Sequence, residues 1–154
     1  MNVERAKLLL LPTAESLGVE VSIPSRAEAE SLRHRAVLAF ADSGVVSSEN
    51  LVHGARITQD QSWELLAEFP YRGEVLVFSN FRDGDSMFKF RSISEAVLVL
   101  GESPPFDFYL VNPELTFLFA HDEYENLFGC GDGMEFVLAH GGEVFGCVRG
   151  MRED

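Results

Sequence analysis

The chain has 154 residues, of which 46% are hydrophobic and 24% are charged, and its 25 acidic residues against 12 basic ones give a net charge of −13. This length and composition are typical of one folded domain with a buried core and argue against a disordered chain. The negative charge disfavours binding to nucleic acid or to an anionic membrane surface through a basic patch, because both of these partners are themselves anionic.

The cysteines and the apolar runs indicate the cellular compartment of the protein. Cys130 and Cys147 are the only cysteines, and the chain shows no secretion signal and no apolar run near the roughly 20 residues that a membrane span needs. A pair of cysteines in such a chain predicts reduced thiols rather than a disulfide framework. We therefore expect a cytoplasmic protein that does not bind membranes.

The N-terminal part of the chain is predicted to begin with two helices and a short strand between them. A first helix over 2–10 is expected, and Pro12 either ends it or starts the next turn. A further single turn over 13–18 should stop at Gly18, and the alternation over 19–23 favours a short edge strand. Residues 25–28 have the serine and glutamate of a capping box, which predicts a helix that runs to about residue 42.

Further helices are predicted before the sheet begins. A short helix is expected over 47–53, and a second capping-box pattern predicts a helix over 58–69. Its apolar spacing places Trp63, Leu66 and Ala67 on the inward face.

The next segment combines two strands with a helix. The nearly continuous apolar run over 74–79 is typical of a central strand, and the alternation over 87–90 predicts a hairpin with it across an Asp-Gly turn. Ser92 and Glu95 form another capping-box pair, so a helix should follow and end at Gly101.

The run over 106–131 has the clearest strand pattern in the chain. Its strands are expected at 106–111, 115–120 and 126–130. The short turns between them predict an antiparallel meander, since parallel neighbours need a long crossover. A helix over 132–140 and a last short strand over 144–148 complete the prediction.

Together these elements predict an α+β fold in a single domain, residues 1–154. An N-terminal helical half should be followed by an antiparallel sheet of about four or five strands, with helices packed on one face. The sequence shows no internal repeat and no linker.

Residues of the types that bind zinc gather towards the C-terminus. They are His121, Cys130, His140 and Cys147. They lack the closely spaced pairs on which structural zinc sites are usually built, so we predict no metal site and no cofactor. The glycine-rich segment 129–133 lacks the lysine of a phosphate-binding loop, and Asp132 would repel a phosphate, so a tight turn explains it better.

A small enzyme is an alternative interpretation of the same region. Cys130 precedes a predicted helix, where a thiolate is stabilised, and His121 or His140 would serve as its base with Asp132 nearby. This alternative requires the fold to bring separate segments together. Because no catalytic motif is evident, the sequence favours a protein that is not an enzyme.

The last candidate is a surface for a basic protein partner. It consists of Tyr109, Asp122, Glu123, Tyr124 and Glu125. Aromatic residues often anchor interfaces, and surrounding carboxylates would attract a basic partner and speed its association. We therefore predict a protein-binding module that contacts its partner at this acidic turn.

The run FDFYLVNPELTFLFAHDEYENLFGCG, residues 106–131, resembles a group of small acidic bacterial proteins, some of which are associated with toxin–immunity loci. The resemblance implies an immunity-type function, in which an acidic protein neutralises a basic toxin. A homo-oligomeric structural domain that pairs through an edge strand is a further alternative.

Overall fold

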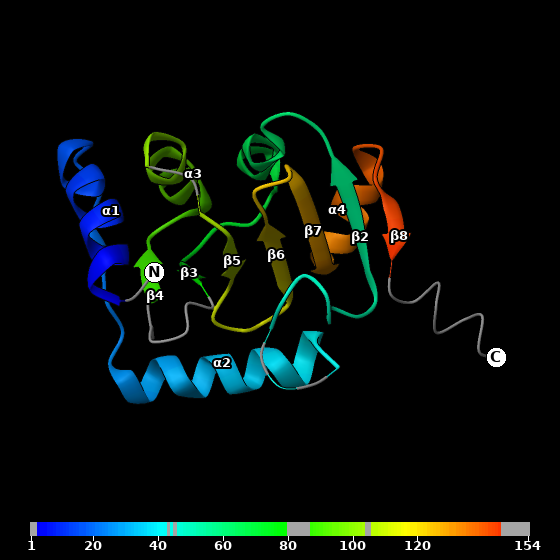
Figure 1. Cartoon of the computed structure of the whole chain (residues 1–154), viewed down its shortest axis with the longest axis horizontal. Coiled ribbons are helices and arrows are strands. Elements are labelled where there is room, and N and C mark those ends of the chain that lie inside the picture. The colour runs from blue at the N-terminus through cyan, green and yellow to red at the C-terminus, as the bar shows by residue number, and fades with distance from the viewer. Residues whose placement is uncertain (1–2, 43, 45, 80–86, 104–105, 146–154) are drawn as a thin grey trace.

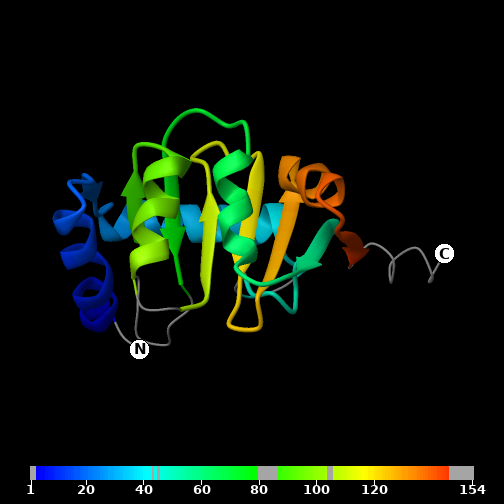
Figure 2. The same cartoon turned by 90° about the horizontal axis from the view of Figure 1, so that it is seen from above.

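The computed structural model describes residues 3–42, 44, 46–79, 87–103 and 106–145, with side chains from Leu10 onwards. These residues form one antiparallel sheet with helices on both faces (Figures 1 and 2). The strands are β1 (Val21–Ser22), β2 (Gly54–Thr58), β3 (Val75–Phe78), β4 (Met87–Phe90), β5 (Phe108–Val111), β6 (Phe117–His121), β7 (Asn126–Gly131) and β8 (Glu143–Phe145). The helices are α1 (Val3–Ser16), α2 (Arg26–Phe40), the 3-10 helix η1 (Ser62–Glu68), α3 (Ile93–Glu102) and α4 (Asp132–Ala139).

The α+β class is confirmed, but the predicted number of strands is wrong. The sheet has eight strands in the order β1-β4-β3-β5-β6-β7-β2-β8, not four or five. The N-terminal half is therefore not purely helical, because it supplies β1 at one edge and β2 between β7 and β8.

Strand β2 has no counterpart in the sequence prediction. Residues 55–58 alternate apolar and polar side chains over only four positions, and the prediction uses Gly54 as the end of one helix and Thr58 as the start of the next. The structure requires a glycine at position 54: a Cβ would lie 2.7 Å from the Phe145 ring and 2.8 Å from the carbonyl oxygen of Gly129. Pairing with β7 and β8 on both sides, and not local propensity, makes this segment a strand.

The prediction that helices cover one face of the sheet is also wrong. Among the described helices, α2 covers one face, whereas α1, η1, α3 and α4 pack on the other (Figures 1 and 2). Alternate residues of β5 therefore enter two separate cores: Phe108 and Leu110 lie on the four-helix face, and Tyr109 and Val111 lie on the α2 face.

The two clearest helix starts are confirmed in detail. The Glu28 amide donates to Ser25 Oγ at 3.2 Å, and the Glu95 amide donates to Ser92 Oγ at the same distance. Such caps typically contribute about 1 kcal/mol each. The helix after Ser92 does not end at Gly101 as predicted, because α3 continues to Glu102. The Trp63 ring packs against Gly101, and a Cβ at this position would lie 2.6 Å from the ring.

Helix α1 does not end at Pro12. It continues to Ser16, although Pro12 has no N–H to donate to the helix. Leu10 and Ala14 are both buried in the core, and this burial offsets the missing hydrogen bond. Gly18, whose φ is 71°, lies just beyond the end of the helix, and the Val19 amide donates to the Ala14 carbonyl at 2.9 Å.

The helices expected over 47–53 and 58–69 are revised. The first is a turn segment containing an isolated bridge between Ala41 and Leu51, and the second is the shorter 3-10 helix η1. With about three residues per turn, a 3-10 helix directs positions three apart to the same side. Trp63 and Leu66 therefore face the core, whereas Ala67 is exposed.

The meander and the hairpin are confirmed. Strands β5, β6 and β7 pair antiparallel in sequence, and β3 pairs antiparallel with β4. The Asp83–Gly84 turn and residues 146–148 of the predicted last strand lie outside the described residues. Over the described ranges, no helix is both long enough and apolar enough to cross a bilayer.

Candidate functional site

The turn between β6 and β7 is the centre of the candidate site. We call it, with the neighbouring carboxyl group before β5, the acidic tip: Asp107, Asp122, Glu123, Tyr124 and Glu125. Asp122 holds the turn in one conformation. Its Oδ1 accepts hydrogen bonds from the amides of Tyr124 at 2.9 Å and Asn126 at 3.1 Å, and its Oδ2 accepts one from Asn126 Nδ2 at 3.0 Å.

Tyr124 is the most exposed aromatic residue among those described. Its fractional exposure is 73%, so its ring contributes little to the core. Because the backbone around it is fixed by Asp122, the ring is presented on a rigid turn. A rigid, exposed tyrosine loses little conformational entropy when a partner covers it.

His121 lies at the base of the tip, at the end of β6. It is 9% exposed and stacks on Phe108 with ring centroids 5.5 Å apart. Its Nε2 is 3.3 Å from Glu125 Oε2, and neither atom has a hydrogen bond of good geometry among the described residues. Burial lowers the pKa of His121, and the negative charges of Glu125, Asp122 and Asp107 only partly oppose this effect.

The carboxyl groups at the tip also affect one another. The pKa of Asp107 is raised, first by partial burial and then by repulsion from the neighbouring charges of Asp122 and Glu123. The second of these causes shows that the carboxylates of the tip repel one another. A bound cation would relieve this repulsion.

A cavity of about 270 Å³ opens beside the acidic tip, and we call it the tip cavity. Its lining combines the rings of Trp63, Phe106 and Phe108 with the polar side chains of Asp60, His121 and Glu125. Aromatic faces together with carboxylates favour a cationic group, because both attract positive charge. The geometry therefore suits a lysine or arginine side chain.

Tyr109, which the sequence analysis assigns to the partner-binding surface, does not belong to it. Its side chain is 7% exposed and lies on the α2 face, stacked on Phe78 with ring centroids 5.4 Å apart. The alternation of β5 sends Phe108 towards the tip cavity and Tyr109 to the opposite side. The expectation that Tyr109 is exposed is wrong.

The residues of the enzyme alternative are not assembled. Cys130 has no exposed surface and belongs to the core on the α2 face, and burial raises its pKa to about 12. His121 lies on the other face, and Cys130 pairs with Leu118, three positions away along β6. A thiol that stays protonated and is separated from its base by the sheet is not a nucleophile.

His140 and Asp132 lie at opposite ends of α4. His140 Nδ1 is 2.9 Å from the Phe136 carbonyl oxygen, and its Nε2 is 3.7 Å from Glu68, while Asp132 is exposed at the first position of the helix. No group of three His, Cys, Asp or Glu side chains within the described ranges is arranged to hold a metal ion. Cys147 lies outside those ranges.

The glycine-rich segment acts as a close contact between β7 and α4. A Cβ on Gly129 would lie 2.3 Å from the Gly133 carbonyl oxygen, and one on Gly131, whose φ is 61°, would lie 2.4 Å from the Thr116 carbonyl oxygen. The predicted need for a positive φ therefore applies to Gly131, whereas Gly129 is required by its close packing against α4.

The sequence pattern indicates the turn but not the cavity beside it. Asp60 and Trp63 reach the tip cavity from η1 and the turn before it, and Phe106 reaches it from the segment before β5. Trp63 has a helical apolar spacing that predicts a core residue, so no local signal links it to the tip. Comparisons of the chain with protein-family models, with curated proteins and with solved structures found no match.

Proposed function

We propose that the protein is a binding module for a basic protein partner and that the acidic tip is its contact surface. The observation that carries this proposal is Tyr124, a 73% exposed ring held on a rigid turn between carboxylates. Interfaces are commonly anchored by one such aromatic residue with a polar rim around it.

The charge of the chain supports the same proposal. A net charge of −13 draws a basic partner towards the protein from any direction, and the clustered carboxylates of the tip would orient it on arrival. This long-range attraction weakens as salt is added, so the association rate should fall with ionic strength.

The tip cavity supplies the specific contact in this proposal. A lysine or arginine side chain of the partner would enter between the rings of Trp63 and Phe106 and place its charge near Glu125. Cation–π contacts contribute about 0.5–2 kcal/mol, depending on how far the cation is desolvated.

A narrower form of the proposal is an immunity-type role, in which the partner is a basic toxin and binding neutralises it. It is supported by the acidic charge, by the resemblance of residues 106–131 to acidic proteins of toxin–immunity loci, and by the separation of His121 from Cys130. Pairing through edge strands has less support, because β1 and β8 are only 2 and 3 residues long within the described chain.

The experiment compares variants that carry equal net charge. Asp107→Asn with Glu123→Gln neutralises two carboxylates at the tip, whereas Glu15→Gln with Glu49→Gln neutralises two exposed carboxylates elsewhere. We expect the wild type and the second variant to capture the same basic protein from a lysate of the native host, and the tip variant to lose it. An equal loss of capture in both variants would show that net charge, and not the tip, determines binding, and undiminished capture by the tip variant would contradict a contact at these carboxylates.

A further inference from the structure

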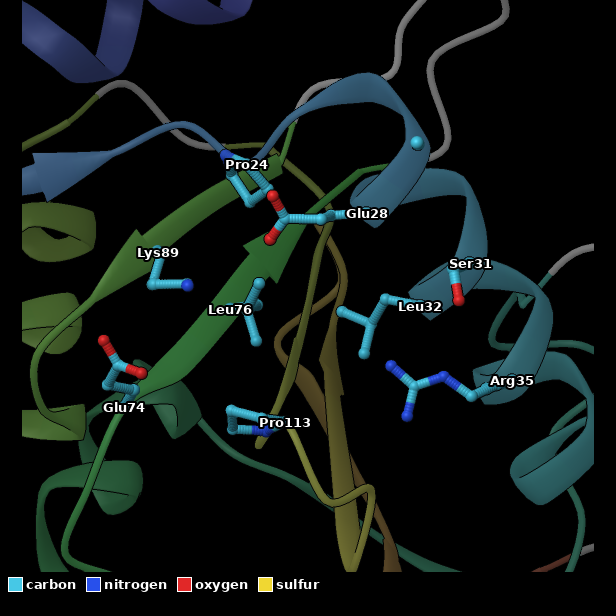
Figure 3. A pocket seen from close by; sticks show the side chains of 10 residues that line it. Pro24, Glu28, Ser31, Leu32, Arg35, Glu74, Leu76, Lys89 and Pro113 are labelled. Atoms are coloured by element: carbon cyan, nitrogen blue, oxygen red, sulfur yellow. The ribbon is translucent and has the colours of Figure 1, made fainter.

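A second cavity lies on the α2 face, away from the acidic tip, and we call it the α2 groove. It has a volume of about 410 Å³ and lies between α2, the start of β3, β4 and the segment after β5 (Figure 3). This volume falls within the roughly 300–1,000 Å³ that is usual for small-molecule sites. The floor is apolar and includes Leu32, Leu76 and Pro113.

Four charged side chains line this groove. They are Glu28, Arg35, Glu74 and Lys89. Within the described part of the chain, no ion pair involves any of the four. Lys89 is the cross-strand partner of Leu76, so both side chains lie on the α2 face, and it is the half-buried position of a strand whose other residues are buried.

The charges lie on both sides of the groove. Figure 3 shows Arg35 extending from α2 on one side and Glu74 and Lys89 on the other, with Leu32, Leu76 and Pro113 between them. Glu28 extends from α2, as Arg35 does, and its Oε1 accepts a hydrogen bond from Ser25 Oγ at 3.1 Å, so each side of the groove carries one positive and one negative side chain. The groove as a whole is therefore neutral and presents charges of both signs.

These charges discriminate between classes of ligand. A simple anion would be attracted by Arg35 and Lys89 but repelled by Glu28, Glu74 and the −13 charge of the whole chain. A simple cation would be attracted by the glutamates but would leave Arg35 and Lys89 without an opposite charge and would be repelled by both. A zwitterion avoids both penalties. Each of its charged groups meets an opposite charge in the groove, and because it has no net charge the negative field of the protein does not repel it as a whole.

We propose that the α2 groove binds a small zwitterion, a molecule with a carboxylate and an ammonium group joined by an apolar body. Arg35 receives the carboxylate, for which the planar guanidinium offers paired donors. Glu74, which lies opposite Arg35, receives the ammonium group, and the apolar body covers Leu32 and Leu76 (Figure 3).

Three probes of equal chain length test this proposal: ε-aminocaproate, caproate and hexylammonium, each titrated into the full chain by calorimetry and by amide NMR. We expect ε-aminocaproate to bind with a Kd on the order of 1 mM, because a ligand with so few atoms binds weakly. Binding should shift the amide signals of Leu32 and Leu76. Caproate and hexylammonium should each bind at least about tenfold more weakly, because each leaves one side of the groove unsatisfied.

Variants locate the site. Arg35→Gln and Glu74→Gln should each weaken ε-aminocaproate binding by about tenfold, whereas Arg56→Gln, an exposed arginine on β2 at the far side of the sheet, should not change it. Absence of binding, equal binding of caproate or hexylammonium, or an equal effect of Arg56→Gln would each overturn the proposal. None of these outcomes bears on the acidic tip, which shares no residue with the groove.

Discussion

The two ends of the β6–β7 hairpin both contain candidate site residues but differ in packing. At one end, Gly129 and Gly131 bring backbone into contact with backbone and Cys130 is sealed in the core. At the other end, Asp122 holds an exposed turn that carries Tyr124 beside a cavity. The same pair of strands thus has a closed end and an open end. The difference shows that reactive residue types are informative only when their surroundings leave room for a ligand.

The largest effect on stability is expected at the closed end. Gly129→Val should lower the free energy of unfolding by about 3 kcal/mol or more, because its Cβ would meet the Gly133 carbonyl oxygen at 2.3 Å and backbone cannot rotate away. Urea denaturation followed by Trp63 fluorescence measures this loss.

Gly141→Ala is the matched control for that experiment. No atom lies within 4 Å of the added Cβ, and only the φ of 99° is unfavourable, so a cost of about 1 kcal/mol is expected. Equal costs for the two substitutions would contradict the close packing of β7 against α4.

At the open end, the expected effect is on binding and not on stability. Tyr124→Ala should weaken the affinity for the basic partner by about 2 kcal/mol or more, roughly thirtyfold, while the free energy of unfolding changes by less than about 0.5 kcal/mol. Calorimetric titration with the captured partner measures the loss. Leu38→Ala on α2 removes a side chain that is also 73% exposed, and it should leave the affinity unchanged.

Cys130 provides a chemical test of the closed end. In a Cys147→Ser background, the Cys130 thiol should react with a disulfide reagent roughly a hundredfold more slowly in the folded chain than in urea, since reaction requires opening of the core. Fast reaction of the folded chain would place Cys130 at the surface.

The pH dependence of stability follows from the same thiol. The pKa of Cys130 is raised by burial from 9.0 to about 12. Above pH 9 the unfolded chain loses the thiol proton while the folded chain keeps it, so stability should fall as the pH rises from 9 towards 12. Cys130→Ala should remove this part of the alkaline loss.

The smallest expected effect concerns His121. Burial lowers its pKa in the folded chain, so below about pH 6.5 the unfolded chain binds more protons than the folded one. Its contribution to stability should be complete above that pH and should decline as the pH falls. His121→Phe should reduce this acid dependence, and urea denaturation between about pH 5 and pH 8 measures it.

Local signals predicted the parts of the fold that depend on neighbours in sequence. The capping boxes at Ser25 and Ser92 and the meander over 106–131 are of this kind, since their hydrogen bonds and turns lie within a few residues. Strand β2 was not predictable in this way, because it exists through pairing with β7 and β8. The 3-10 geometry of η1 likewise altered which residues face inward.

The candidate site was predictable only in part, for the same reason. The carboxylates and Tyr124 are adjacent in sequence, and their pattern indicated a binding turn. The tip cavity joins three distant segments, represented by Asp60, Phe106 and His121, and no sequence spacing relates them. The exposure of Tyr109 was misjudged because an alternating strand gives no sign of which face is covered, and here both faces are covered.

Photo-crosslinking from position 124 tests the central claim most directly. A photoreactive phenylalanine analogue is placed at Tyr124 or, as the equally exposed control, at Leu38, and the native host lysate is irradiated. The account predicts that position 124 is joined to a basic protein and that position 38 is not. Crosslinking of that protein from position 38 alone, or from both positions equally, would contradict a contact surface at the acidic tip.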